Sequence, residues 1–166
     1  MRGQMHHLDL TVSELARSRP FYELVLGFLG YRCVKDTDEV VVWDLTLPDG
    51  VCGIAIRPAL RPRTHDRYTV GLHHFAWNAD NRGDVDRLHD KLAAAGVTIL
   101  DAPAAYPQYG AGYYAVFFAD PDGLKLEYVH TPARRPSQSS TKKPPGRAAL
   151  SRCSEPEGPV ISSSIP

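Results

Sequence analysis

The sequence predicts an α+β fold of two tandem modules, each made of one strand, one helix and three further strands. A doubled histidine opens an alternating stretch twice, in MHHLDLTV and again in LHHFAWNA. The second histidines of these motifs, His7 and His74, lie 67 residues apart, and similar elements follow each of them. A fixed offset between similar segments indicates a duplicated unit. We therefore expect two βαβββ modules, over about residues 5–58 and 71–130, whose curled mixed sheets form a cup.

In the first module, alternation of apolar and polar side chains predicts the strands, and a three-four spacing of apolar residues predicts the helix. Pro20 fits only in the first turn of that helix, which favours Ser18 over Ser13 as its capping residue. Gly27 and Gly30 are expected to end the helix. The expected strands cover residues 7–12, 31–35, 40–47 and 51–57.

The second module repeats this order. Asp84 is expected to cap its helix, and Gly96 to end it. Residues 120–123, Asp-Pro-Asp-Gly, form a turn before the last strand, because proline presets φ and glycine accepts a positive φ. The expected strands cover residues 72–79, 97–100, 113–119 and 125–129.

Composition excludes several classes of protein. The chain has 166 residues and a formal net charge of +0, which gives no sign of nucleic-acid or membrane-surface binding. It has no apolar run long enough to span a bilayer, and its first residues lack the apolar stretch of a signal peptide, so we expect neither a membrane span nor a secretory leader. The three cysteines form no C-x-x-C pair, so we expect reduced thiols in a cytoplasmic protein.

The segment 131–166 differs from the rest of the chain. It is rich in proline and serine, and it contains six basic residues but only two acidic ones. Because it has few large apolar side chains, burial cannot offset the entropy lost on ordering it. We expect a disordered tail that follows a single domain over residues 1–130.

Three side chains form a candidate metal site. His7 and His74 each lie on the strand face opposite the helix-packing residues, and Glu127 occupies the same face of the last strand. Taken singly, each is an ordinary polar strand residue, but the three occupy equivalent ends of a duplicated unit. Two imidazoles and one carboxylate suit a divalent metal with open positions for a substrate. His6 and His73 are expected at the rim.

The pattern HHLDLTV…RPFYELVLGFLGY, followed by LHHFAWNA and FFADPDGLKLEYV, resembles the vicinal oxygen chelate superfamily. That group includes glyoxalase I, extradiol dioxygenases, fosfomycin-resistance thiol transferases and bleomycin-binding proteins. The resemblance covers about residues 5–130 and implies a cup around a metal that a small substrate chelates through two adjacent oxygens. It implies His7, His74 and Glu127 as ligands. Family members often pair modules across a dimer, so a homodimer is one arrangement that fits.

Differences between this sequence and the patterns of the subfamilies rank the candidate reactions. Glyoxalase I has a fourth ligand, a glutamate near the end of the first module, where this chain has VCGIAIRP without an acid. Fosfomycin enzymes have a threonine where this chain has Asp9, and bleomycin-binding members lack the metal triad. Extradiol dioxygenases use the same three ligands, so ring cleavage with Fe(II) or Mn(II) is the leading expectation. A glyoxalase-like lyase or isomerase with Zn(II) or Ni(II), and a sequestering protein without turnover, remain open.

Candidate residues around the metal follow from the same resemblance and from the loop composition. His65 and Tyr113 are the acid–base candidates of a dioxygenase. The segment 101–114, DAPAAYPQYGAGYY, is either an ordinary surface loop or a flap that lays Tyr106 or Tyr109 against a flat substrate. The expected substrate contacts are Asp9, Asn78, Tyr106 and Tyr109.

Overall fold

The computed structural model describes residues 2–61 and 63–132, and these form two βαβββ modules of an α+β fold. The fold class predicted from the sequence is therefore confirmed. The first module contains β1 (His7–Val12), α1 (Leu15–Phe28), β2 (Arg32–Asp36), β3 (Val41–Leu47) and β4 (Gly50–Pro58). The second contains β5 (Phe75–Asn78), α2 (Arg82–Ala94), β6 (Ile99–Ala105), β7 (Tyr114–Ala119) and β8 (Lys125–His130). The expected disordered tail lies outside the described residues, except for residues 131 and 132.

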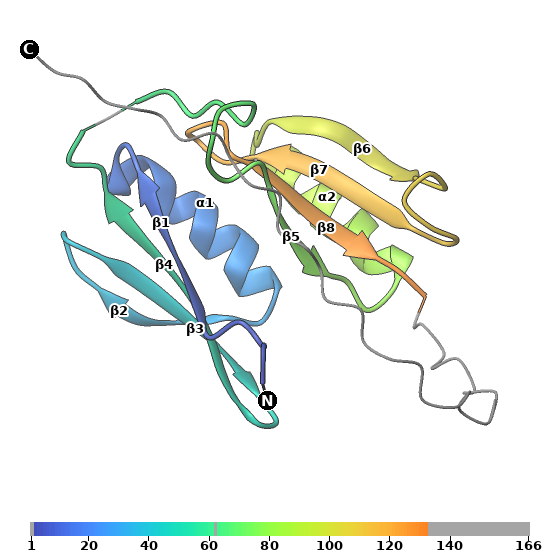
Figure 1. Cartoon of the computed structure of the whole chain (residues 1–166), viewed down its shortest axis with the longest axis horizontal. Helices are drawn as coiled ribbons and strands as arrows, with labels where there is room; N and C mark the ends of the chain where they lie inside the picture. The colour runs from blue at the N-terminus through green and yellow to red at the C-terminus, as the bar shows by residue number, and fades with distance from the viewer. Residues whose placement is uncertain (1, 62, 133–166) are drawn as a thin grey trace, which may run out of the picture. The chain divides into compact units, whose positions relative to one another are not determined.

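Each module has its own four-stranded mixed sheet, with the same topology in both (Figure 1). The strand order is β1-β4-β3-β2 in the first sheet and β5-β8-β7-β6 in the second. The first strand of each module pairs in parallel with the last one, and the remaining pairs are antiparallel. The duplication predicted from the paired histidine motifs therefore extends to the order and direction of the strands.

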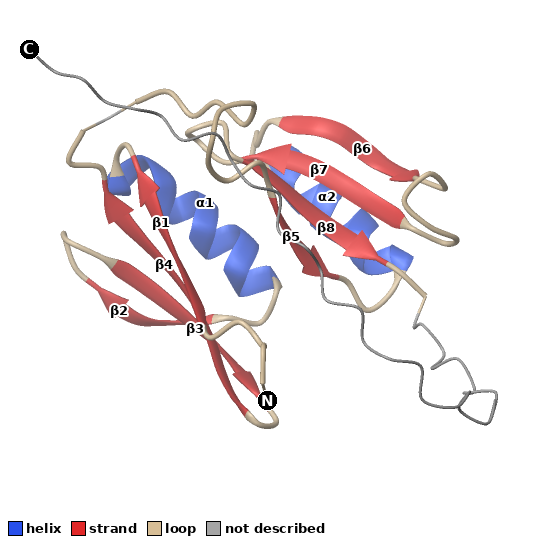
Figure 2. Ribbon diagram, in the orientation of Figure 1, coloured by secondary structure: helices blue, strands red, loops and turns tan. Residues whose placement is uncertain are grey.

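One helix covers one face of each sheet (Figure 2), and a single hydrophobic core joins the covered sides of both modules. Along β1, Leu10 and Val12 are buried in this core, while His7 and Asp9 are exposed on the other face. Contacts between the modules continue this core, since the ring centroids of Phe28 in α1 and Tyr128 in β8 are 6.0 Å apart. The face of each sheet that carries the candidate metal ligands is therefore turned away from the shared core.

The helix α1 begins earlier than the sequence predicts. It starts at Leu15, so Pro20 lies inside it and Ser18 is buried in a helical turn rather than capping it. The physical reason is a contact between modules: Asp122 accepts hydrogen bonds from the backbone N–H of Ser13, at 2.7 Å, and from its hydroxyl. This contact fixes the chain one turn upstream of Pro20, at the cost of a helix that lacks one backbone hydrogen bond.

Several boundaries in the second module also differ from expectation. The strand β5 begins at Phe75 rather than at residue 72, so His74 precedes the strand. The capping residue of α2 is Asn81, whose side-chain oxygen accepts from the backbone N–H of Asp84 at 3.0 Å, so Asp84 lies in the first turn. The strand β6 extends to Ala105, further than the sequence predicts. The segment 101–114 is therefore mostly a hairpin, with residues 106–113 as its connection.

The turn before β8 joins the modules through one buried carboxylate. Asp120 accepts a hydrogen bond of 2.8 Å from the hydroxyl of Tyr22 in α1. Its other oxygen accepts from the backbone N–H groups of Asp122 and Leu124 at 2.9 and 2.8 Å. Gly123 has φ +86°, as the Asp-Pro-Asp-Gly sequence predicts.

Two observations bear on the expectations drawn from composition. Within the described part of the chain, neither helix is long and apolar enough to cross a membrane. Cys33 is exposed, Cys52 is buried, and neither forms a disulfide among the described residues. The third cysteine, Cys153, lies outside those residues.

Candidate metal centre

The second module brings two of the three predicted ligands together. His74 immediately precedes β5, which pairs in parallel with β8, and Glu127 lies in the middle of β8. Nε2 of His74 is 3.5 Å from Oε2 of Glu127. The carboxylate is almost fully buried, while the imidazole is 39% exposed, so the pair opens to solvent through the histidine. Both groups are donors that Fe(II), Mn(II), Zn(II) and Ni(II) accept, and the pair therefore fits a divalent cation.

The second oxygen of Glu127 is held by Tyr113. The tyrosine hydroxyl donates a hydrogen bond of 2.5 Å to Oε1, which leaves Oε2 on the side of His74. Burial raises the pKa of Tyr113, and the hydrogen bond and negative charge of Glu127 raise it further. The phenol therefore stays protonated at neutral pH. Tyr113, predicted as an acid–base residue, lies beside the predicted ligand Glu127 and donates a hydrogen bond to it.

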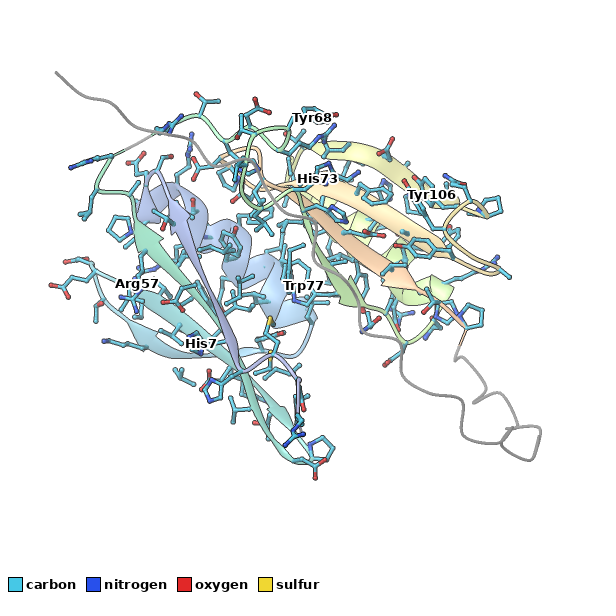
Figure 3. All side chains as sticks on the ribbon, in the orientation of Figure 1. His7, Arg57, Tyr68, His73, Trp77 and Tyr106 are labelled. Carbon is cyan, nitrogen blue, oxygen red and sulfur yellow. The ribbon has the colours of Figure 1, made fainter. Side chains whose placement is uncertain are left out.

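The third predicted ligand lies in the other module. His7 and Asp9 line a groove of about 440 Å³ on the open face of the first sheet, and Asp9 pairs with Arg57 at 3.0 Å. Figure 3 shows His7 and Arg57 on this sheet. Neither His74 nor Glu127 lines that groove. In the described part of the chain, no group of three histidine, cysteine, aspartate or glutamate side chains lies close enough to hold a metal. One chain alone therefore does not assemble the predicted triad.

The cause is the way in which the modules pack. Leu10 on β1 and Leu126 on β8 both belong to the shared core. Side chains alternate along a strand, so His7 and Glu127, on the opposite faces, point out of that core. Strand periodicity predicts the face of each residue correctly. It carries no information on which faces of the two modules meet.

The structure also reveals an acid that the sequence analysis missed. In the first sheet His7 pairs with Gly53 of β4, and Gly53 pairs in turn with Asp44 of β3. A Cβ at Gly53 would lie 3.4 Å from Cβ of His7 and 3.1 Å from Oδ1 of Asp44, so the absent side chain leaves these residues facing one another. The strand β4 contains no acid, but β3, which lies beside it in the sheet, supplies Asp44 on the same face. Alternation along residues 41–47 predicts that face, whereas the pairing of β3 with β4 was needed to bring Asp44 near His7.

Aromatic side chains flank the predicted ligands of the second module. Phe117 pairs with Glu127 across β7 and β8, and its ring meets the edge of Tyr106 with centroids 5.2 Å apart. The rings of Tyr106 and Tyr109 are stacked at 5.9 Å. Nζ of Lys125 lies 3.8 Å from the centroid of Phe117. Tyr106 and Tyr109, which the sequence predicts as substrate contacts, therefore lie with Phe117 and one ammonium group on the side of the sheet that carries Glu127.

The other predicted residues are more distant from this pair. His65 lines two grooves, both with Thr11 and Asp122 and one also with Asp9, and neither groove contains a predicted metal ligand. Its Nε2 is buried without a hydrogen-bond partner in the described part of the chain. Asn78 is exposed at the end of β5, on the same face as Ala76, which pairs with the metal-ligand position of β8. The structure therefore offers no direct support for His65 as an acid–base partner of His74.

Comparison with known proteins identifies the family. The sequence model of the Glyoxalase/Bleomycin resistance protein/Dioxygenase superfamily matches residues 4–128. The chain therefore belongs to this superfamily, as the resemblance of its motifs predicts. It is 38% identical, over 125 residues, to the uncharacterized protein YqjT of Bacillus subtilis (strain 168), with 75% of this chain and 97% of that protein covered.

Solved structures share the fold. A glyoxalase candidate from Bacillus halodurans is 29% identical, with a TM-score of 0.67 over 78% of this chain and 97% of its own. A lactoylglutathione lyase from Agrobacterium tumefaciens is 18% identical, with a TM-score of 0.54 over 77% of this chain and 93% of its own. At 18% identity, the similarity to the lyase shows a shared fold alone.

Proposed function

We propose that this protein is a metal-dependent enzyme whose small substrate chelates a divalent ion through two adjacent oxygens. The observation that carries the proposal is the His74–Glu127 pair, with Nε2 and Oε2 3.5 Å apart at an open face of the second sheet. When bound, the metal supplies Lewis-acid polarisation of the substrate oxygens. His7 is the third proposed ligand, and Fe(II) or Mn(II) suits two histidines and one carboxylate.

The complete site requires two copies of the chain. His7 of one copy would face the His74–Glu127 pair of the other, because within one chain these residues lie on faces turned away from the shared core. The segment between the modules exposes several large apolar side chains, which supports such an association. They are Leu60, Tyr68 and Val70. A two-fold dimer would form two equivalent sites.

Side chains around the pair support a flat substrate with a negative charge. Tyr106 and Phe117 present ring edges and faces beside Glu127. The ammonium group of Lys125 is 3.8 Å from the centroid of Phe117 and forms no ion pair in the described part of the chain. Tyr113 keeps its proton and orients the carboxylate of Glu127. A catechol bearing an acidic group matches these features.

Extradiol ring cleavage is the reaction that we favour. The test is to load the purified protein with Fe(II) without air, add a panel of catechols with and without a carboxylate, and then admit oxygen. Oxygen uptake with a yellow ring-opened product is the expected result. Oxygen uptake should disappear, together with most bound metal, in the His74→Ala and Glu127→Ala proteins.

One observation favours a second reaction, of the glyoxalase-like lyase or isomerase type. Asp44 faces His7 across Gly53 and supplies the carboxylate that β4 lacks. S-lactoylglutathione formation by Ni(II)- or Zn(II)-loaded protein, without oxygen uptake from any catechol, would favour this reaction instead. Tight ligand binding with neither activity would identify a sequestering protein.

Cytoplasmic location is part of the proposal, since Cys33 and Cys52 form no disulfide among the described residues.

A further inference from the structure

The first histidine of each doubled motif makes the same contact with the second. Nδ1 of His6 lies 2.9 Å from Nδ1 of His7, and Nδ1 of His73 lies 2.7 Å from Nδ1 of His74. The rings meet edge to face in both pairs, with centroids 5.2 and 5.0 Å apart and interplanar angles of 87° and 77°. Of these four histidines only His7 lies in a strand, and neighbouring side chains of a regular strand point to opposite faces, so the contact is not a consequence of strand geometry. Its occurrence in both modules indicates a shared role.

The hydrogen-bonding chemistry of imidazole assigns the proton in each pair. A hydrogen bond between two Nδ1 atoms needs one that carries a proton and one that does not. A neutral histidine that binds a metal through Nε2 carries its proton on Nδ1. The second histidine of each pair must therefore donate from Nδ1, and the first must accept at Nδ1 and keep its own proton on Nε2. Both first histidines are exposed, so water can satisfy that Nε2 proton.

In the second module the remaining nitrogen faces the proposed metal position. Nδ1 of His74 is engaged by His73, and Nε2 of His74 is the atom 3.5 Å from Oε2 of Glu127. The contact with His73 therefore leaves the unprotonated nitrogen on the side of the carboxylate. His73 forms no ion pair and no other side-chain hydrogen bond among the described residues, so the ring of His74 is its main polar contact.

We infer that His6 and His73 are positioning residues, which fix the tautomer and ring orientation of His7 and His74 so that Nε2 of each faces the metal. This inference rests on the proposed metal-binding function. It assigns a role to the doubling of the histidines, which the metal triad alone does not require. Outer hydrogen-bond partners of this kind typically change metal affinity by about 10- to 100-fold.

The test compares two substitutions of His73 that differ in their acceptor. His73→Phe keeps a flat ring and removes the acceptor, whereas His73→Asn retains one, because its amide oxygen is three bonds from Cα, as Nδ1 of histidine is. ¹⁵N NMR of the metal-free protein reports the tautomer of His74, and titration with Zn(II) or Co(II) reports affinity. We expect His73→Phe to mix the tautomers of His74 and weaken metal binding roughly 10- to 100-fold. His73→Asn should restore both readouts to within a few-fold of the parent protein.

His89 provides the matched control, since it lies on α2 beside Asp90 and contacts no proposed ligand. His89→Phe should leave the tautomer and the metal affinity unchanged. The inference is wrong if His73→Phe changes neither readout, or if His73→Asn is as defective as His73→Phe. Absence of metal binding by the parent protein would contradict the proposed function instead, and the tautomer of His74 would still decide the role of His73. The same pair of substitutions at His6 should act on His7.

Discussion

The hydroxyl of Tyr113 donates to Oε1 of Glu127 at 2.5 Å, so one oxygen of this buried carboxylate is held by the hairpin while the other faces His74. The hydrogen bond joins the segment predicted as a substrate flap to a proposed metal ligand. Movement of the hairpin would therefore alter the orientation of the carboxylate. This link makes Tyr113 the first residue to test.

Tyr113→Phe should destabilise the protein and weaken metal binding. The substitution leaves Oε1 of Glu127 buried without its donor, and an unsatisfied buried polar group costs about 1–3 kcal/mol. Tyr109→Phe is the control, because the hydroxyl of Tyr109 makes no hydrogen bond in the described part of the chain. Denaturant unfolding measures the first effect and metal titration the second. Equal stability and equal metal affinity of the two variants would show that the hydrogen bond matters little.

Stability should fall in alkaline solution. Burial is the main cause that raises the pKa of Tyr31 to about 12 and also raises the pKa values of Tyr22 and Tyr113. An unfolded tyrosine ionises near about pH 10. The folded state holds these protons more tightly, so the stabilisation is complete below about pH 10 and is lost progressively as pH rises above it.

Unfolding free energies measured between about pH 8 and pH 11 check this prediction, with absorbance near 295 nm reporting tyrosinate. Tyr22→Phe should reduce the loss of stability above about pH 10, because Tyr22 would no longer contribute to it. That variant also lacks the hydrogen bond to Asp120, so its stability is compared with its own value at neutral pH. A free energy of unfolding that stays constant up to pH 11 would contradict the assignment.

The sequence predicts the fold and the faces of the strands correctly, but it does not predict how the candidate site is assembled. Alternation placed His7 and Glu127 on the correct faces because the period of a strand is a local property. The predicted start of α1 is wrong because Asp122, more than a hundred residues away in the sequence, accepts a hydrogen bond from Ser13. The separation of His7 from the other ligands has the same origin, since it depends on how one module packs against the other.

Mixing two inactive variants should restore part of the metal binding if the site is shared between chains. A His7→Ala chain retains His74 and Glu127, and a His74→Ala chain retains His7. Their heterodimer would contain one complete site and one that lacks both histidines. With random exchange of subunits, about a quarter of the parental sites should return.

The exchange experiment needs subunits that are unfolded together and refolded as a mixture, with each variant treated alone as its control. Metal stoichiometry after removal of loosely bound ions is the measurement. A mixture that binds no more metal than the separate variants would contradict the shared site. In that case His7 would have to reach the pair within its own chain, or take no part in metal binding.

The last prediction concerns the charge of the substrate. Lys125→Gln should weaken binding of catechols that bear a carboxylate and leave uncharged catechols nearly unaffected. The ammonium group lies beside Phe117, on the strand that carries Glu127, and makes no ion pair among the described residues. Attraction between unit charges about 4 Å apart near a protein surface lies between about 1 and 4 kcal/mol, so a loss of roughly tenfold in affinity is expected.

Lys91→Gln, on the last turn of α2, is the matched control for loss of one positive charge. Calorimetric binding of each catechol to metal-loaded protein without air gives the affinities without requiring turnover. An equal loss for charged and uncharged catechols would show that Lys125 supports the sheet rather than selecting an anion, because only an interaction with the carboxylate depends on its charge.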